Sequence, residues 1–195
     1  IAQYFYPQYQ TKVMNEGWAS FCHYYIMNRL YDKSLLTEGA MLEFIKLHTG
    51  VLYQPSYNSR YYSGFNPYYL GFEIFNDIKR ICTEPSEEDL EWFPDLKGAD
   101  WLDVCLDAVE NYRDESFIRQ YLSPHMMRKL RLFSLSDDKS ETDFYKIEAI
   151  HNEAGYKKIR NSLASEYELS NWLPKIEVVD ADIKNTRRLS LVYYE

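Results

Sequence analysis

Cysteine and long apolar runs are scarce in this sequence, and each shortage excludes a class of protein. The three cysteines, Cys22, Cys82 and Cys105, have no CxxC spacing, and we interpret them as reduced thiols of a cytoplasmic protein. No apolar run approaches the roughly 20 residues of a membrane span. No charged segment followed by an apolar core opens the chain. The sequence therefore predicts neither a membrane span nor a secretion signal.

Positive charge and the common catalytic motifs are scarce as well. Lys and Arg number 22 against 30 Asp and Glu, which gives a formal net charge of −8. Because a protein that binds phosphate backbones needs a basic surface, no nucleic-acid partner is expected. The chain has no glycine-rich phosphate loop, no GxSxG elbow and no HExxH helix. The simplest nucleotide-binding, serine-hydrolase and complete zinc-peptidase sites are thereby excluded.

Tyrosine is abundant, with 19 residues in a chain of 195. A content of 46% hydrophobic and 27% charged residues is typical of a folded globular protein. Tyrosine favours places where its ring is dry and its hydroxyl finds a partner or water. Such places are grooves, clefts and interfaces, and we expect them here.

Helix start signals recur through the first two-thirds of the chain. A capping residue, in two cases followed by proline, precedes each predicted helix. Gly71 lies inside one of these helices, where it costs about 1 kcal/mol relative to alanine, so another element is expected to pack close to it. The first two helices are expected to pair antiparallel. The predicted N-caps are Asn15, Thr37, Asn66, Ser86, Asp100 and Ser123, and the main helices cover residues 15–31, 38–48, 67–82 and 101–112.

The hydrophobic period changes after residue 130. Four segments have strand-like patterns, and a helix over residues 152–167 lies between the second and the third. The strands are expected at residues 130–135, 144–150, 176–183 and 189–194. The sequence therefore predicts an α+β fold, with a mainly helical domain at residues 1–130 and a small ββαββ unit at residues 131–195.

The first predicted helix carries a carboxylate and an imidazole, Glu16 and His23, among aromatic residues. Seven residues separate them, so they share a helix face but lie roughly 10.5 Å apart along the axis, too far to bind one metal ion together. Glu16 is a candidate for chemistry and equally for a structural acid of the first helical turn, paired with Lys12 or Arg29. A buried apolar stripe is expected at Trp18, Phe21, Cys22, Tyr25, Ile26 and Leu30.

Residues 51–65 have no helical period and are rich in tyrosine. Irregular segments of this length in compact domains are often functional, but a lid over an apolar helix face explains the pattern equally well. Both alternatives stay open. The candidate binding residues of this segment and the helix start after it are Tyr53, Tyr57, Arg60, Tyr61, Asn66 and Tyr68.

The pentad Asn15-Glu16-Gly17-Trp18-Ala19 resembles the helix that supplies the third zinc ligand in thermolysin-like gluzincins. The resemblance implies a metal-ligand role for Glu16 and places His23 beside the metal or as an acid/base group. The other zinc ligands would have to come from outside this sequence. A peptidase or a peptidoglycan amidase would follow from that reading.

Four longer segments carry a family resemblance, namely NEGWASFCHYYIMNRLYD from Asn15, LLTEGAMLEF from Leu35, GFNPYYLGF from Gly64 and EWFP from Glu91. With these segments the chain resembles the SpoVR family, stage V sporulation protein R. The resemblance implies a longer bacterial protein of the cytoplasm, linked to spore cortex formation and to stress responses. It also implies a PrkA-type serine kinase and a von Willebrand A-like protein as partners. A scaffold or regulatory role is the preferred hypothesis, and the zinc metallohydrolase is the alternative.

Overall fold

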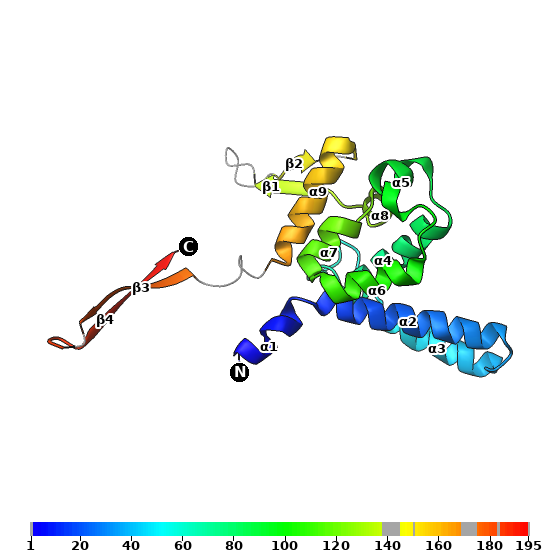
Figure 1. Ribbon diagram of the computed structural model, residues 1–195, viewed down its shortest axis with the longest axis horizontal. Helices are drawn as coiled ribbons and strands as arrows, with labels where there is room; N and C mark the ends of the chain where they lie inside the picture. Colours follow the sequence, from blue (N-terminus) through cyan, green and yellow to red (C-terminus); the bar gives the residue numbers. More distant parts are fainter. Residues whose placement is uncertain (1, 138–144, 150, 169–174, 183, 195) are drawn as a thin grey trace.

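A computed structural model describes residues 2–137, 145–149, 151–168, 175–182 and 184–194. Helices surround one apolar core, and two short β-hairpins lie before and after the last helix in the chain (Figure 1). The α+β prediction and the order of the ββαββ elements are confirmed. The elements are α1 (Ala2–Tyr9), α2 (Lys12–Asp32), α3 (Glu38–Val51), α4 (Pro67–Thr83), α5 (Glu87–Trp92), the 3-10 helix η1 (Pro94–Leu96), α6 (Trp101–Asn111), α7 (Asp114–Tyr121), α8 (Pro124–Lys129), β1 (Ser134–Asp137), β2 (Tyr145–Ala149), α9 (Glu153–Glu166), β3 (Lys175–Asp182) and β4 (Arg188–Tyr194).

Helices α2 and α4 cross at backbone contact, and this crossing organises the helical part. A Cβ atom added to Gly17 would lie 2.4 Å from the carbonyl carbon of Gly71. One added to Gly71 would lie 2.1 Å from the carbonyl oxygen of Val13. No residue larger than glycine fits either position without moving a helix. The close approach predicted for Gly71 is confirmed.

Local signals place most helix starts, but the start of α2 was predicted wrongly. Thr37, Asn66 and Ser86 accept hydrogen bonds from backbone N–H groups of their own helices, as predicted. In α2, the N-cap is Thr11, whose side chain makes no capping hydrogen bond, and not Asn15. The carboxylate of Asp114, from α7, instead accepts hydrogen bonds from the N–H groups at the start of α2, at 2.8 and 2.9 Å. A partner about 100 residues away thus fixes this helix end.

The core lies between α2, α4, α7, α8 and α9. Phe21, Phe75 and Phe117 are among its largest fully buried side chains. Helix α9 contributes Ile159 and Leu163 to the same apolar cluster. Helix α9 packs on α7 and also on the first hairpin, so it contacts both of the predicted domains. The predicted boundary between a helical domain and a ββαββ unit at residue 130 stays a prediction.

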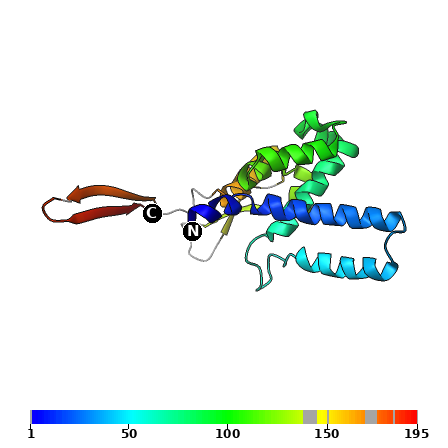
Figure 2. The same cartoon turned by 60° about the horizontal axis from the view of Figure 1, so that its bottom comes forward.

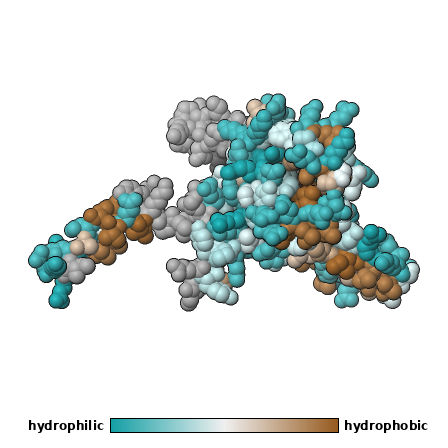
Figure 3. All heavy atoms as spheres, in the orientation of Figure 1, coloured by the Kyte–Doolittle hydropathy of each residue, from teal (hydrophilic) through white to brown (hydrophobic). Residues whose placement is uncertain are grey.

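The second half of α2 leaves this core and forms an antiparallel arm with α3, as predicted (Figure 2). The expected burial of Ile26 was wrong, because that side chain is 53% exposed on the arm. Leu42 and Leu47 of α3 are also exposed, and Figure 3 shows apolar surface over α2 and α3. The buried side of α3 consists of Met41, Phe44 and His48.

Both β-hairpins are antiparallel, and each forms a separate two-stranded sheet. The first begins later than predicted, because α8 and its C-cap Leu130 occupy the start of the expected strand at residues 130–135. Residues 144, 150 and 183, at the ends of two expected strands, lie outside the described residues. The second hairpin closes where Asp182 accepts hydrogen bonds from the backbone N–H groups of Asn185 and Thr186.

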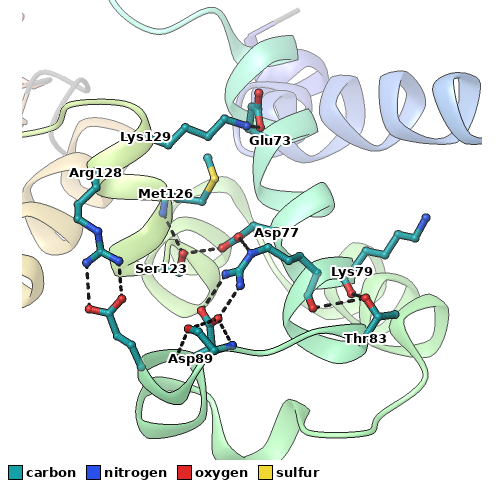
Figure 4. A network of polar contacts seen from close by, with 12 residues as sticks. Glu73, Asp77, Lys79, Thr83, Asp89, Ser123, Met126, Arg128 and Lys129 are labelled. Atoms are coloured by element: carbon teal, nitrogen blue, oxygen red, sulfur yellow. Dashed lines mark hydrogen bonds and ion pairs between the residues drawn. The ribbon is translucent and has the colours of Figure 1, made fainter.

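A polar network ties α4 to α5 and α8 (Figure 4). Arg80 donates to Asp77 at 2.8 Å and to both carboxylate oxygens of Asp89, at 2.5 and 2.8 Å. The hydroxyl of Ser123 donates to Asp77 at 2.5 Å and accepts from the backbone N–H of Met126 at 3.0 Å. Asp77, Asp89 and Ser123 are buried, so every charge in the network depends on its partners.

Candidate functional site

Glu16 lies on α2, next to the glycine contact with α4. That contact brings the first turn of α4 alongside, where the hydroxyl of Tyr68 comes close to the Glu16 carboxylate. The carboxylate as an acceptor, followed by burial and the carboxylate charge, raises the pKa of Tyr68. The predicted partners Lys12 and Arg29 are not the ones that the structure shows for Glu16. Two residues from separate predictions, Glu16 and Tyr68, thus form one pair.

His23 faces α3 and belongs to a different cluster from Glu16. Its ring lies 4.9 Å from the ring of Phe44 and 6.3 Å from the ring of His48, measured between centroids. Tyr24 and Phe72 complete the surroundings of His48, with centroid distances of 5.5 and 5.2 Å. We call these five rings the imidazole cluster. It joins the arm to α4.

His48 is the residue of this cluster that sequence reasoning missed. It is only 8% exposed, and its Nε2 atom has no hydrogen-bond partner among the residues that the structure describes. Burial lowers the pKa of His48, and the charge of His23 lowers it further. His48 lies on the buried side of α3, where a lone histidine most often serves the core. The lack of a partner for Nε2 depends on how Phe72 of α4 packs on His48, which the sequence alone does not show.

Replacing His48 with phenylalanine is expected to leave the melting temperature unchanged or to raise it by a few degrees. The ring contacts persist, and the cost of a buried nitrogen without a partner, about 1 kcal/mol, disappears. Thermal unfolding followed by circular dichroism measures the effect. His48→Ala is the control, because it also removes the ring and should destabilise the arm. A marked loss of stability in His48→Phe would show that the nitrogen is paired in solution.

A zinc site requires three protein ligands, and the described residues do not supply them. No group of three or more His, Cys, Asp or Glu side chains in the described part of the chain is arranged to hold a metal ion. Glu16 lies close to the Tyr68 hydroxyl, while His23 belongs to the imidazole cluster. The side chains present fit one zinc ligand, not a complete site.

Hydrogen bonds made by Asn66 hold together the two ends of the tyrosine-rich segment between α3 and α4, and we call these bonds the latch. The backbone N–H of Asn66 donates to the side chain of Gln54 at 2.7 Å. The Asn66 amide donates to the carbonyl oxygens of Val51 and Tyr53 at 2.8 and 3.2 Å. Asn66, a predicted binding residue, therefore has a structural task as helix cap and latch.

Three aromatic rings of this segment and the ring of Phe133, which follows α8, contact one another edge to face in a row. Phe65 contacts Tyr62 at 6.4 Å, Tyr62 contacts Tyr57 at 5.5 Å, and Tyr57 contacts Phe133 at 5.8 Å between ring centroids. We call these four residues the aromatic ladder. Tyr57 and Phe133 are 63% and 45% exposed, so the ladder continues to the surface.

The aromatic ladder lines a groove of about 1010 Å³. Its other walls come from the end of α8 and from α9, including Lys129, Arg131 and Leu163. Lys129 forms an ion pair with Glu73 at 2.5 Å, so part of this positive charge is neutralised. Burial, the largest cause, raises the pKa of Tyr62. The groove thus combines aromatic rings with apolar and polar side chains and a few charged ones, and we call it the aromatic groove.

Of the predicted binding residues, Tyr57 alone lines this groove. Tyr53 and Tyr61 are exposed elsewhere on the same segment. The guanidinium of Arg60 lies 4.6 Å from the ring centroid of Tyr61 and donates a hydrogen bond to its hydroxyl. The sequence thus identified the segment, but not which of its tyrosines face the groove.

Comparison with known proteins gives a consistent family. Residues 1–172 match the family described as SpoVR like protein. The chain is 54% identical over 193 residues to the uncharacterized protein YcgB of Escherichia coli, covering 99% of this chain and 38% of that relative. No solved structure matches significantly. Within the described residues, no helix is both long and apolar enough to cross a membrane. The chain belongs to the SpoVR family.

Proposed function

We propose that this SpoVR-family protein acts in the bacterial cytoplasm as a scaffold or regulatory partner of a sporulation and stress-response module, with the aromatic groove as its binding surface. One observation carries the proposal, namely the aromatic ladder that runs from the buried side of the groove to exposed rings at Tyr57 and Phe133. The module would include spore cortex formation in bacteria that form spores.

Aromatic rings of this kind suit protein recognition. Tyrosine and phenylalanine are enriched at interfaces, where they offer a large contact area for few rotatable bonds. The latch by Asn66 and the edge-to-face contacts hold the rings in place before a partner arrives. Less ordering is then required on binding, which favours affinity.

The candidate partners are the PrkA-type serine kinase and the von Willebrand A-like protein that the SpoVR resemblance implies. The test is a pull-down with the full-length protein immobilised and each purified partner in solution. We expect at least one partner to be retained at physiological salt concentration. If neither binds, alone or together, the scaffold proposal fails.

A second candidate, a zinc metallohydrolase acting on peptide or peptidoglycan bonds, is favoured by a different observation. The Glu16 carboxylate lies close to the Tyr68 hydroxyl, and in the imidazole cluster the buried Nε2 of His48 has no hydrogen-bond partner among the described residues. Hydrogen bonds to a ligating carboxylate commonly orient it. Glu16 would be one ligand, His23 an acid/base group, and the remaining ligands would come from outside residues 1–195.

The metallohydrolase candidate predicts about one zinc ion per full-length chain and its loss in Glu16→Gln. Zinc in the purified protein is measured by inductively coupled plasma mass spectrometry. Glu43→Gln is the matched control, because Glu43 is an exposed glutamate of α3 and should not affect zinc content. Full-length protein without stoichiometric zinc, or a Glu16→Gln variant that keeps it, would rule out this candidate.

A further inference from the structure

The β3–β4 hairpin has one apolar face and one polar face. Cross-strand partners share a face of a hairpin. The register pairs Ile176 with Tyr193 and Val178 with Leu191 on one face. The other face is mainly polar, with Asp180 paired to Ser190 and Asp182 to Arg188, and it also carries Val192 opposite Glu177. A register shift between Val178 and Asp180 absorbs the extra residue and preserves this division.

The apolar face of the hairpin is open. Its large side chains are between 55% and 61% exposed, namely Ile176, Val178, Leu189, Leu191 and Tyr193. Figure 3 shows apolar surface along the hairpin. The acidic and hydroxyl groups on the opposite face are compatible with solvent, whereas the apolar face is expected to pack against another surface.

The helical part does not cover this face. Figures 1 and 2 show the hairpin projecting away from the helices, and the principal contacts of β3 and β4 are with each other. A lone two-stranded hairpin is marginally stable in water at best. Both strands also have one edge without a neighbouring strand in the described structure, and such edges accept further strands. The hairpin therefore requires an additional layer.

The share of the relative YcgB that the match covers indicates where that additional layer comes from. The SpoVR match ends at residue 172, before β3, whereas the match to YcgB covers 99% of this chain. Only 38% of YcgB is matched, so most of that relative lies outside the corresponding segment. The hairpin thus follows the SpoVR-like region and is shared with a much longer protein.

We propose that the β3–β4 hairpin belongs to a small β-structured unit that is completed by a part of the same protein outside residues 1–195. That part covers the apolar face at Val178 and Leu191 and adds strands to the hairpin edges. An occupant on the same chain is present at a high effective concentration, which a separate partner is not. A hairpin that cannot hold its shape alone needs this cover from the time it folds.

Photo-crosslinking of the full-length protein tests which molecule covers the face. A benzophenone amino acid replaces Leu191, and the matched control carries it at Ser190 on the opposite face. We expect the Leu191 position to crosslink to a peptide of the same chain outside residues 1–195, in a product of monomer mass. The Ser190 position should give far less product. A product of doubled mass, a crosslink into residues 2–168 or no crosslink at Leu191 would overturn the proposal.

Hydrogen exchange of the full-length protein gives a second test that needs no variant. The amides of residues 176–193 should be protected by at least about 100-fold, equally at two protein concentrations tenfold apart. Leu191→Asp should lose this protection while α4 keeps its own, and Ser190→Asp should retain both. Unprotected hairpin amides, or protection that grows with concentration and so indicates a second copy, would overturn the proposal.

Discussion

Gly17→Ala is expected to lower the free energy of unfolding by about 3 kcal/mol, the upper part of the range for overpacked positions. The added methyl group would lie 2.4 Å from backbone atoms of Gly71, and backbone cannot move aside as a flexible side chain can. Helix α4 would have to shift along its whole contact with α2. Urea unfolding of the protein, followed by circular dichroism, measures the change.

Gly39→Ala is the matched control for this prediction. Gly39 also lies in a helix, α3, but an added Cβ would meet nothing within 4 Å. Because alanine favours helices over glycine by about 1 kcal/mol, this variant should be as stable as the unmodified protein or more so. If Gly17→Ala loses no more stability than Gly39→Ala, the helices do not cross at backbone contact.

Asp89→Ala is expected to cost about 3 kcal/mol, because it leaves the guanidinium of Arg80 without its main partner. Asp89 is 1% exposed, accepts two hydrogen bonds from Arg80 and accepts another from the backbone N–H of Ser86 at 2.8 Å (Figure 4). Its removal loosens α5 from α4. Glu153→Ala is the control, because the ion pair of Glu153 with Lys157 is exposed and should not affect stability measurably. Equal stabilities of the two variants would contradict the network.

The same carboxylate gives the stability a pH dependence of known sign. Burial alone would raise the pKa of Asp89, but hydrogen bonds from Arg80 and Ser86 and the charge of Arg80 hold it well below its usual range. A folded-state pKa below the unfolded value of about 3.9 stabilises the protein above pH 4, and this contribution is lost as the pH falls further. The stability difference between unmodified protein and Asp89→Asn should therefore shrink between pH 5 and pH 2. A constant difference would argue against the ion pair.

Sequence patterns predicted helices well where the signal is local. Thr37, Asn66 and Ser86 cap their helices through neighbouring N–H groups, so the sequence around each is sufficient. The start of α2 depends instead on Asp114, which local reasoning cannot find. Ile26 is exposed because α2 extends past the end of its contact with α4. Where that contact ends depends on packing, which the spacing of apolar residues does not reveal.

The candidate site shows the same division. The sequence identified Glu16 and the tyrosine-rich segment from residue types and spacing. It could not pair Glu16 with Tyr68, because a glycine contact between two helices brings them together. Nor could it place Tyr57 against Phe133, whose position follows the end of α8. Residue types and spacing therefore predict candidate side chains, and the packing of the helices determines which of these side chains lie next to each other.

The affinity of the full-length protein for its retained partner tests the central claim most directly, namely that the aromatic groove binds a partner protein. Tyr57→Ala should raise the dissociation constant about 30-fold, the effect of losing an interface hot spot of about 2 kcal/mol. Tyr61→Ala is the matched control, because Tyr61 is an exposed tyrosine of the same segment that does not line the groove. Isothermal titration calorimetry should show weaker binding in Tyr57→Ala alone. Equal dissociation constants for the unmodified protein and Tyr57→Ala would contradict the claim.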